Sequence, residues 1–437
     1  MLLIYVQKPS TRINYIFKHI CLRILGVEVE FTYVIEEFIS HTGPKLSYGK
    51  QPLGNELFLQ SHGLLTQQGF ESIEINVKEW EETKCFFSVH DKSALPFDIF
   101  SAGFYLLSRY EEYLPHVKDE KGRFPVSESL AFKEKFLEQP VVDIWAYKFK
   151  KVLQLHFPYL EFPQRLMIIH NVIGVYEPFA FKQKGLFRSL AGYANDFLKF
   201  RIRRNFRRTR VLLGFKEDPY NTFNWIIDRV KKSSINLSIF FLLGDNNIFN
   251  EGINSKRKKI KELIKFIADY KQVGLIFSTI SFSDFEILKK EKKQLENITN
   301  RNLISSMNSQ YLVNLPEIYR NLVELEIERD FTMVYENTAG FRAGSCTPFL
   351  FYDLDYEINT PLLIHPLALT TIAMQDKKDS VKIYEVKKII ASVKEVNGTF
   401  SMLFTNKDFT PISKNKVWRA LFTENFNSMI KQNRFKA

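Results

Sequence analysis

LSIFFLL (237–243) and VGLIFS (273–278) are two apolar runs that flank a segment with apolar residues at helical spacing, 256–270. Short apolar runs of this kind are typical of strands that are buried on both faces. A strand, a helix and another strand in succession are the pattern of parallel sheets. This part of the chain therefore predicts a parallel sheet or a β/α barrel.

The same alternation continues on both sides of these two runs. Other apolar runs predict strands, and segments with apolar residues every three or four positions predict helices between them. The further predicted strands are 165–169, 335–341 and 362–364, and the further predicted helices are 219–232, 283–297 and 316–327.

The first part of the chain mixes short strand patterns with one strong helical pattern. Residues 28–34 alternate polar and apolar side chains, as a half-buried strand does. Residues 1–6 are apolar, but no basic region precedes them, so they predict a first strand rather than a signal peptide. Residues 98–113 predict a helix that Asp98 caps and Pro115 ends.

Pro158 and Pro163 enclose the best candidate for a domain boundary. We expect an α/β N-terminal domain over residues 1–160 and a second α/β domain over residues 164–437.

The composition is that of a globular protein. Of 437 residues, 45% are apolar and 25% are charged, which excludes a disordered chain, a coiled coil and a collagen-like fibre. Three scattered cysteines are too few for a disulfide framework or a cysteine-based zinc site. No apolar run is long enough for a transmembrane span, so we predict a cytoplasmic protein.

Eight strings occur in an order that resembles a bacterial family related to the polysaccharide deacetylases, the family 4 carbohydrate esterases. Members of this family carry an uncharacterised N-terminal domain before a divergent deacetylase domain. The strings are LPFDIFSAGFYLLSRYEEYLPH (95–116), KGRFP (121–125), PVVDIWA (140–146), PFAFKQKGLFRSLAG (178–192), DPYNTF (218–223), FFLLGD (240–245), GFRAGSCTPFLFYDL (340–354) and VNGTFSMLF (396–404).

The resemblance implies that the second domain is a distorted β/α barrel, with reactive groups at the carboxyl ends of its strands. It also implies a chemistry. A divalent metal, usually zinc, is held by one aspartate and two histidines, and it activates water while another aspartate acts as the base. The reaction is removal of an acetyl group from a sugar.

The catalytic and metal-binding residues of the family are replaced at each position that can be aligned. The two aspartates before the Pro-Phe-Ala string fall on Gly174 and Tyr176, and a ligand histidine falls on Ile276. The histidine near the C-terminus, which would act as the general acid, falls on Thr405. We therefore expect no metal or other cofactor in this chain.

Other residues remain candidates for a pocket. Gly340-Phe341-Arg342-Ala343-Gly344 matches the family pattern, in which the arginine orients the catalytic aspartate. Here Arg342 either pairs with a different carboxylate, such as Glu177, and holds the loop, or contacts an anionic or saccharide ligand. The candidate pocket residues are His170, Glu177, Arg342 and Ser345.

Basic residues cluster in KFRIRRNFRRTR (199–210) and again at 256–261. Because 199–210 contains no acid, we expect an exposed positive surface rather than core. The net charge of +12 agrees with an anionic partner. We expect contact with a membrane surface or acidic polymer through Arg203, Arg204, Arg207 and Arg208, and no specific nucleic-acid binding.

Three functions remain open from the sequence. The first is a catalytically degenerate deacetylase-like protein that binds saccharide or a partner in surface-polysaccharide metabolism. The second is a working carbohydrate deacetylase whose altered site recruits two or more of Glu177, His170, Asp284 and Asp353. The third is an interaction module that acts through the basic segment. Whether the protein is an enzyme therefore depends on how these side chains are arranged in the structure.

Overall fold

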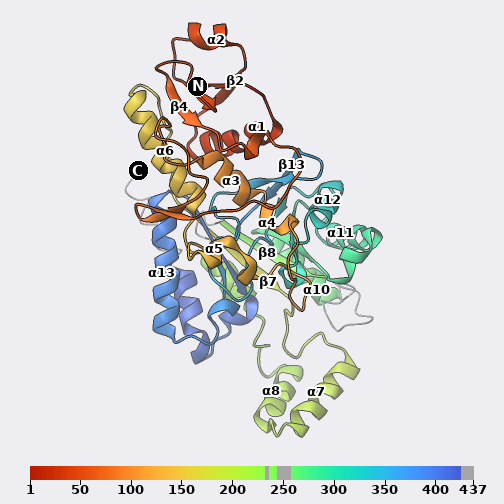
Figure 1. Cartoon of the computed structure of the whole chain (residues 1–437). Helices are drawn as coiled ribbons and strands as arrows, with labels where there is room; N and C mark the ends of the chain where they lie inside the picture. Colours follow the sequence, from red (N-terminus) through yellow and green to blue (C-terminus); the bar gives the residue numbers. More distant parts are fainter. Residues whose placement is uncertain (232–235, 244–256, 425–437) are drawn as a thin grey trace. The chain divides into compact units, whose positions relative to one another are not determined.

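The computed structural model describes residues 1–231, 236–243 and 257–424 (Figure 1). The chain forms two compact units, and neither is continuous in sequence. Unit 1 comprises residues 1–168, 310–373 and 384–401, and unit 2 comprises residues 169–309, 374–383 and 402–437. Residues 310–373 are grouped with residues 1–168 in unit 1. The domain boundary at Pro158–Pro163 stays a prediction.

Unit 2 is built on parallel strands, each of which is followed by helical segments. The strands lie in the order β10-β9-β8-β7-β15, and β7, β8, β9 and β10 are mutually parallel. They are β7 (Ile168–Val175), β8 (Asn236–Leu242), β9 (Gln272–Phe277), β10 (Ser305–Asn308) and β15 (Thr399–Thr405), of which residues 402–405 belong to unit 2. The α/β class with parallel strands is confirmed, whereas closure into a barrel stays a prediction.

The helices of unit 2 connect these strands. Two of them, α10 and α11, pack against β9 and against each other. Their buried apolar residues recur at helical spacing, as in Ile260, Ile264 and Ile267 of α10. The helices are α7 (Leu186–Leu198), α8 (Ile202–Leu212), α9 (Phe223–Val230), α10 (Lys258–Ala268) and α11 (Phe285–Thr299).

Two expected strands differ from the structure. The strand placed at 165–169 is β7, which begins at Ile168 and continues to Val175, so His170 lies near its start rather than at its end. The strand placed at 335–341 is wrong, because this segment is an irregular loop. Gly340 has a φ of +139° there, and a Cβ at this glycine would lie 2.6 Å from Leu137, so an ordinary strand residue does not fit.

Unit 1 contains a second parallel sheet, with the strand order β2-β1-β3-β4. Its central strand β1 is buried throughout. After this sheet in sequence, β5 and β6 form an antiparallel hairpin. Later in the chain, β13 pairs antiparallel with β12 and parallel with β11. The strands are β1 (Leu2–Val6), β2 (Val29–Thr32), β3 (Lys45–Gly49), β4 (Leu57–Gln60), β5 (Lys78–Trp80), β6 (Thr83–Cys85), β11 (Arg329–Asp330), β12 (Phe349–Asp353), β13 (Ile358–Ile364) and β14 (Leu369–Thr370).

The helix expected at 98–113 is divided in two. Asp98 caps α3 by accepting hydrogen bonds from the backbone nitrogens of Phe100 and Ser101. Arg109 then takes a left-handed conformation with φ of +55°, and α4 begins after it. The helices of unit 1 are α1 (Thr11–Phe17), α2 (Ile35–Ser40), α3 (Ile99–Leu107), α4 (Tyr110–Tyr113), α5 (Leu130–Lys133), α6 (Val141–His156), α12 (Glu317–Glu324) and α13 (Asp379–Glu395), which begins in unit 2.

None of the helices in the described ranges has both the length and the apolar character needed to span a bilayer.

His19 gives the stability of unit 1 a dependence on pH. It lies in the π-helical turn Lys18–Ile24, where its side chain is buried and its ring meets the edge of Phe349. Burial, together with the charges of Arg23 and Arg165, lowers the pKa of His19 from 6.5 to about 3. The folded protein therefore keeps a neutral imidazole while the unfolded chain takes up a proton below pH 6.5, so stability falls as the pH is lowered from 6.5 towards 3.

We expect the free energy of unfolding to fall by roughly 2 kcal/mol between about pH 6.5 and pH 5 because of this one group. Urea unfolding at several pH values measures the loss, and the His19→Leu variant should lack that part of it. The same pH dependence in both proteins would contradict the assignment.

Candidate functional site

Three positions that the family resemblance assigns to catalysis lie together in unit 2, towards the carboxyl ends of β7 and β9. Gly174 is on β7 and Ile276 is on β9, and Tyr176 directly follows β7. A Cβ placed on Gly174 would lie 3.1 Å from Cε2 of Tyr176 and 3.7 Å from Cδ1 of Ile276. The ring of Tyr176 therefore covers Gly174, and an aspartate at position 174 would have to displace it.

This arrangement contains no acid, base or metal ligand of the kind the family uses. Ile276 is fully buried, and Gly174 offers only backbone atoms. The fourth family position, Thr405, ends β15 and caps the following turn. Its hydroxyl lies 3.0 Å from Oδ2 of Asp408, and the same carboxylate oxygen accepts from the Thr405 backbone nitrogen at 2.7 Å. Thr405 thus has a local structural role.

A charged cluster lies beside these positions in unit 2. The Glu177 carboxylate accepts hydrogen bonds from Nζ of Lys407 at 2.6 Å and from Nζ of Lys184 at 3.2 Å. Burial alone would raise the pKa of Glu177, but the bonds and charges of the two lysines outweigh it and lower the pKa. Glu177 is therefore ionised near neutral pH and engaged by two cations, which makes it a weak proton acceptor.

Asn406 connects this cluster to Tyr220. Its Nδ2 donates to the backbone oxygens of Glu177 at 3.0 Å and Tyr220 at 2.9 Å. The Lys407 ammonium lies 5.1 Å from the centroid of the Tyr220 ring. Within the described part of the chain, the buried Oδ1 of Asn406 has no hydrogen-bond partner.

His170 lies at the other end of β7 from this cluster. Its Nε2 is 3.0 Å from Oγ of Ser238, and polar contacts continue through Gln272 to Ser305 at the starts of β9 and β10. Five residues, or roughly 16 Å of strand, separate His170 from Val175. His170 therefore does not face the carboxyl ends of the strands, and it does not join Glu177.

Arg342 and Ser345 lie in unit 1, where each has buried partners. Nε and Nη2 of Arg342 donate to the two carboxylate oxygens of Glu112 at 2.9 and 2.8 Å, and Arg109 donates to the same acid at 2.8 Å. The partner of Arg342 is thus Glu112, whereas Glu177 pairs with lysines. Burial opposes ionisation of Glu112, but the two guanidinium groups prevail and lower its pKa.

Ser345 belongs to a loop that is bound to one buried carboxylate of α6, Asp143. The Ser345 hydroxyl donates to Oδ2 of Asp143 at 2.7 Å, and the Cys346 backbone nitrogen donates to the same oxygen at 3.0 Å. Thr347 donates through its hydroxyl to Oδ1. Burial and the nearby Asp143 charge raise the pKa of the Cys346 thiol, which excludes it as a ready nucleophile.

The two other carboxylates that an altered site could recruit also have structural roles. Asp284 caps α11 by accepting from the backbone nitrogen of Glu286 at 2.9 Å. Asp353 accepts from Nε and Nη2 of Arg320 at 2.5 and 2.8 Å. Among residues 1–231, 236–243 and 257–424, no three His, Cys, Asp or Glu side chains are grouped so that they could hold a metal ion.

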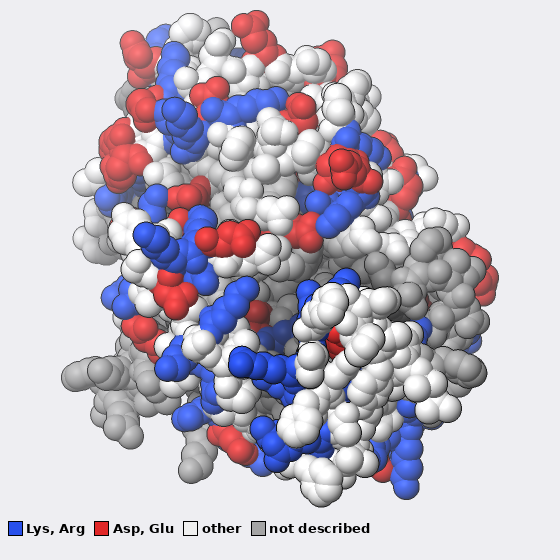
Figure 2. All heavy atoms as spheres, turned by 90° about the horizontal axis from the view of Figure 1, so that it is seen from below, with Lys and Arg blue, Asp and Glu red and all other residues white. Residues whose placement is uncertain are grey.

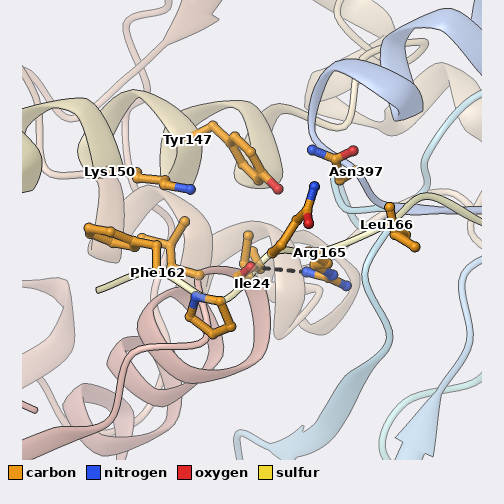
Figure 3. Close-up of a pocket in the computed structure, with 10 residues that line it drawn as sticks. Ile24, Tyr147, Lys150, Phe162, Arg165, Leu166 and Asn397 are labelled. Carbon is orange, nitrogen blue, oxygen red and sulfur yellow. Dashed lines mark hydrogen bonds between the residues drawn. The ribbon is translucent and has the colours of Figure 1, made fainter. Parts of the chain in front are cut away.

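Unit 1 also contains a pocket of about 280 Å³ that no sequence motif marked (Figure 3). Its walls come from α6, the turn after the π-helix and residues 162–166. Arg165 crosses it and donates to the backbone oxygens of Arg23 and Ile24 at 3.1 Å each. Lys150 lies 4.9 Å from the centroid of the Phe162 ring. These cations are engaged by the protein, and the volume suits only a small polar group.

The residues that sequence reasoning missed are the partners of the candidates. Glu112 and Asp143 both lie within strings that carried the family resemblance, but no role was attached to them. For Asp143 the signal is a single acidic residue among the apolar residues that begin α6, which requires a buried partner. Glu112 stands beside Glu111 and close to Arg109, so no such signal marks it. The identity of that partner depends on contacts more than 200 residues apart, such as Glu112 with Arg342.

Comparison with known proteins gives one family and several distant structures. Residues 2–158 match a family described as a family of unknown function, DUF7033. No curated protein matches the chain. A structure named as a polysaccharide deacetylase from Mycobacterium smegmatis is 10% identical, with 62% of this chain and 86% of that chain covered and a TM-score of 0.39.

Two further structures are of a CE4 family pseudoenzyme. The protein from Bacillus anthracis is 11% identical, with 62% of each chain covered and a TM-score of 0.30. A mutant of this pseudoenzyme, described as having restored enzymatic activity, is also 11% identical, with 62% of this chain and 64% of that chain covered and a TM-score of 0.31. These values mark a distant likeness.

Proposed function

We propose that this chain is a catalytically degenerate, polysaccharide deacetylase-like protein that binds saccharide without hydrolysing it. The observation that carries the proposal is the meeting of Gly174, Tyr176 and Ile276, with the Tyr176 ring over the glycine. The family resemblance places two aspartates and a ligand histidine at these positions. An aromatic ring and an aliphatic side chain stand there instead, so the metal-bound water and its base have no counterparts.

The acids elsewhere do not provide a substitute. Glu177 is the carboxylate next to Tyr176 in sequence, and its two lysine partners hold it ionised. Hydrolysis needs a base whose pKa lies near the working pH, and a carboxylate with a lowered pKa is poorly suited to that task. Glu177 is better suited to orienting Lys184 and Lys407.

The Glu177 cluster, which directly follows Tyr176 in sequence, favours a polar, uncharged ligand with apolar faces, as a sugar is. Tyr176 and Tyr220 are half-buried, so part of each ring is available for packing. Lys184 and Lys407 supply donors. A few directed polar groups among aromatic surfaces are the usual composition of a ligand site.

Titration calorimetry of the full-length protein with N-acetylated chito-oligosaccharides tests this proposal. We expect binding, and we expect Tyr176→Ala to weaken it by about tenfold or more through loss of aromatic packing, while Tyr176→Phe retains it. The matched control is Tyr159→Ala, because the Tyr159 side chain is 97% exposed and remote in sequence from the site. The absence of binding, or equal binding by the Tyr176→Ala variant, would contradict the proposal.

A further inference from the structure

Helices α7 and α8 of unit 2 form a hairpin that presents large apolar side chains to solvent. In Figure 1 both helices lie at the lower end of the view, beyond the strands β7 and β8 of their unit. We call the following residues the hairpin surface: Leu190, Phe197, Leu198, Phe200, Ile202 and Phe206. Phe200, in the turn between the helices, is 89% exposed, and Leu198 is 76% exposed. Exposed apolar groups gathered in this way mark an interaction site.

The spacing shows that each helix directs an apolar stripe outwards. Leu186, Leu190 and Phe197 are separated by four and seven residues on α7, and Ile202 and Phe206 are four apart on α8. Residues at these intervals share one face of a helix. In an ordinary surface helix that face would be turned towards the core, and here it is exposed.

Other residues hold the two helices together, so the hairpin surface is not needed for that purpose. Arg208 of α8 donates to Oδ2 of Asp196 on α7 at 2.5 Å and to the backbone oxygen of Gly192 at 3.1 Å. Its guanidinium also lies 5.1 Å from the Phe181 ring centroid and 5.2 Å from that of Tyr193. The expectation that Arg208 belongs to an exposed basic surface is therefore wrong, because it is buried against Asp196.

The remaining cations border the hairpin surface. Arg203, Arg207 and Arg210 are exposed; Arg203 and Arg210 lie three and four residues from Phe206, and Arg207 directly follows it. Arg204 is also exposed, with its Nε 3.5 Å from Oδ1 of Asp196. From Pro178 to Lys216 the only acid is Asp196, which is buried. Figure 2, viewed from the lower side of Figure 1, shows a broad area without charge whose margins carry Lys and Arg side chains. The surface is thus apolar with a positive border.

We propose that this hairpin docks on the surface of an anionic lipid bilayer. Arg203, Arg207 and Arg210 would contact lipid phosphates, and Phe200, Leu198 and Ile202 would enter the boundary between head groups and acyl chains. A bilayer is favoured over an acidic polysaccharide because it accepts both the charge and the apolar side chains. A second copy of the chain is disfavoured, because its surface would present the same positive border. The inference is independent of the proposed saccharide site.

Co-sedimentation of the full-length protein with lipid vesicles tests the docking. We expect binding to phosphatidylcholine vesicles that contain about 30% phosphatidylglycerol to be at least about tenfold tighter than binding to phosphatidylcholine alone. Binding should weaken as salt is raised, because exposed charges are screened. The chain has four tryptophans of its own, so the emission of the Phe200→Trp variant is compared with that of the parent protein. The difference should shift to shorter wavelength on binding, which reports entry into the bilayer.

Two sets of substitutions separate the contribution of the arginines from that of the apolar side chains. The triple change Arg203→Gln, Arg207→Gln and Arg210→Gln, and the double change Phe200→Ser and Ile202→Ser, should each reduce vesicle binding by about tenfold or more. Both leave Arg208 and Asp196 intact, and unchanged thermal unfolding confirms that they fold. The matched control is Lys258→Gln, Lys259→Gln and Lys261→Gln on α10, three exposed cations outside the hairpin, which should change binding by less than about twofold.

Three results would overturn the proposal. One is the absence of binding to anionic vesicles. Another is salt-dependent binding to an acidic polysaccharide such as alginate, with no vesicle binding. The third is a dimer of the free protein that dissociates in the Phe200→Ser, Ile202→Ser variant, which would assign the hairpin surface to a second copy of the chain.

Discussion

Replacing Arg342 by methionine is expected to lower the free energy of unfolding by about 3–5 kcal/mol. The Arg342 guanidinium and the Glu112 carboxylate are 1% and 3% exposed, and two hydrogen bonds join them. Loss of the guanidinium leaves a buried acid with only Arg109 as a charged partner. Methionine preserves much of the volume, so the loss reports the charge and its hydrogen bonds rather than a cavity.

Urea unfolding of the full-length protein measures this effect. The control is Lys133→Met, which removes a cation from an exposed ion pair with Glu128 and should cost less than about 1 kcal/mol. If Arg342→Met is as stable as the parent protein, the arginine of the Gly-Phe-Arg-Ala-Gly motif is not retained for structure. It would then be a candidate for ligand contact, which was the second sequence-based interpretation.

Asp143→Ala is expected to lower the free energy of unfolding by about 3 kcal/mol, at roughly 1 kcal/mol for each donor left without its acceptor. The Asp143 carboxylate is fully buried and accepts from Ser345, Cys346 and Thr347. These bonds hold the segment after the motif against the start of α6. Asp269→Ala, at a side chain that is 70% exposed, is the control, and an equal effect in both variants would contradict the role of Asp143.

The parts of the fold that could be predicted are those with a local pattern. The runs at 237–243 and 273–278 predicted β8 and β9 because apolar residues predominate there. The end of β7 was placed six residues early, at 169, because the strand continues through Asn171 and Gly174, which are atypical of strands. The break in the helix at Arg109 arises from its buried bonds to Glu111, Glu112 and the backbone of Arg342, which no local pattern shows.

In the candidate site, too, some features could be predicted from the sequence and others could not. The resemblance named Gly174, Tyr176 and Ile276, and the structure brings them together. Pairings between distant segments were not predictable, because residue types alone do not choose among 49 acids and 61 basic residues. Arg208 shows this well: its partner Asp196 lies just outside the basic stretch and on a different helix. The saccharide ligand and the cytoplasmic location stay predictions.

Acetate release from N-acetylated chito-oligosaccharides is the most direct test of whether the site around Tyr176 lacks hydrolytic activity. The purified full-length protein is assayed with zinc, cobalt or manganese ions added, beside a protein-free blank. We expect no release above the blank, and no change on Glu177→Gln, because Glu177 is held ionised by Lys184 and Lys407 and the family positions hold glycine, tyrosine and isoleucine. Release that a chelator abolishes, or that Glu177→Gln reduces, would show instead that the site is a working deacetylase centre.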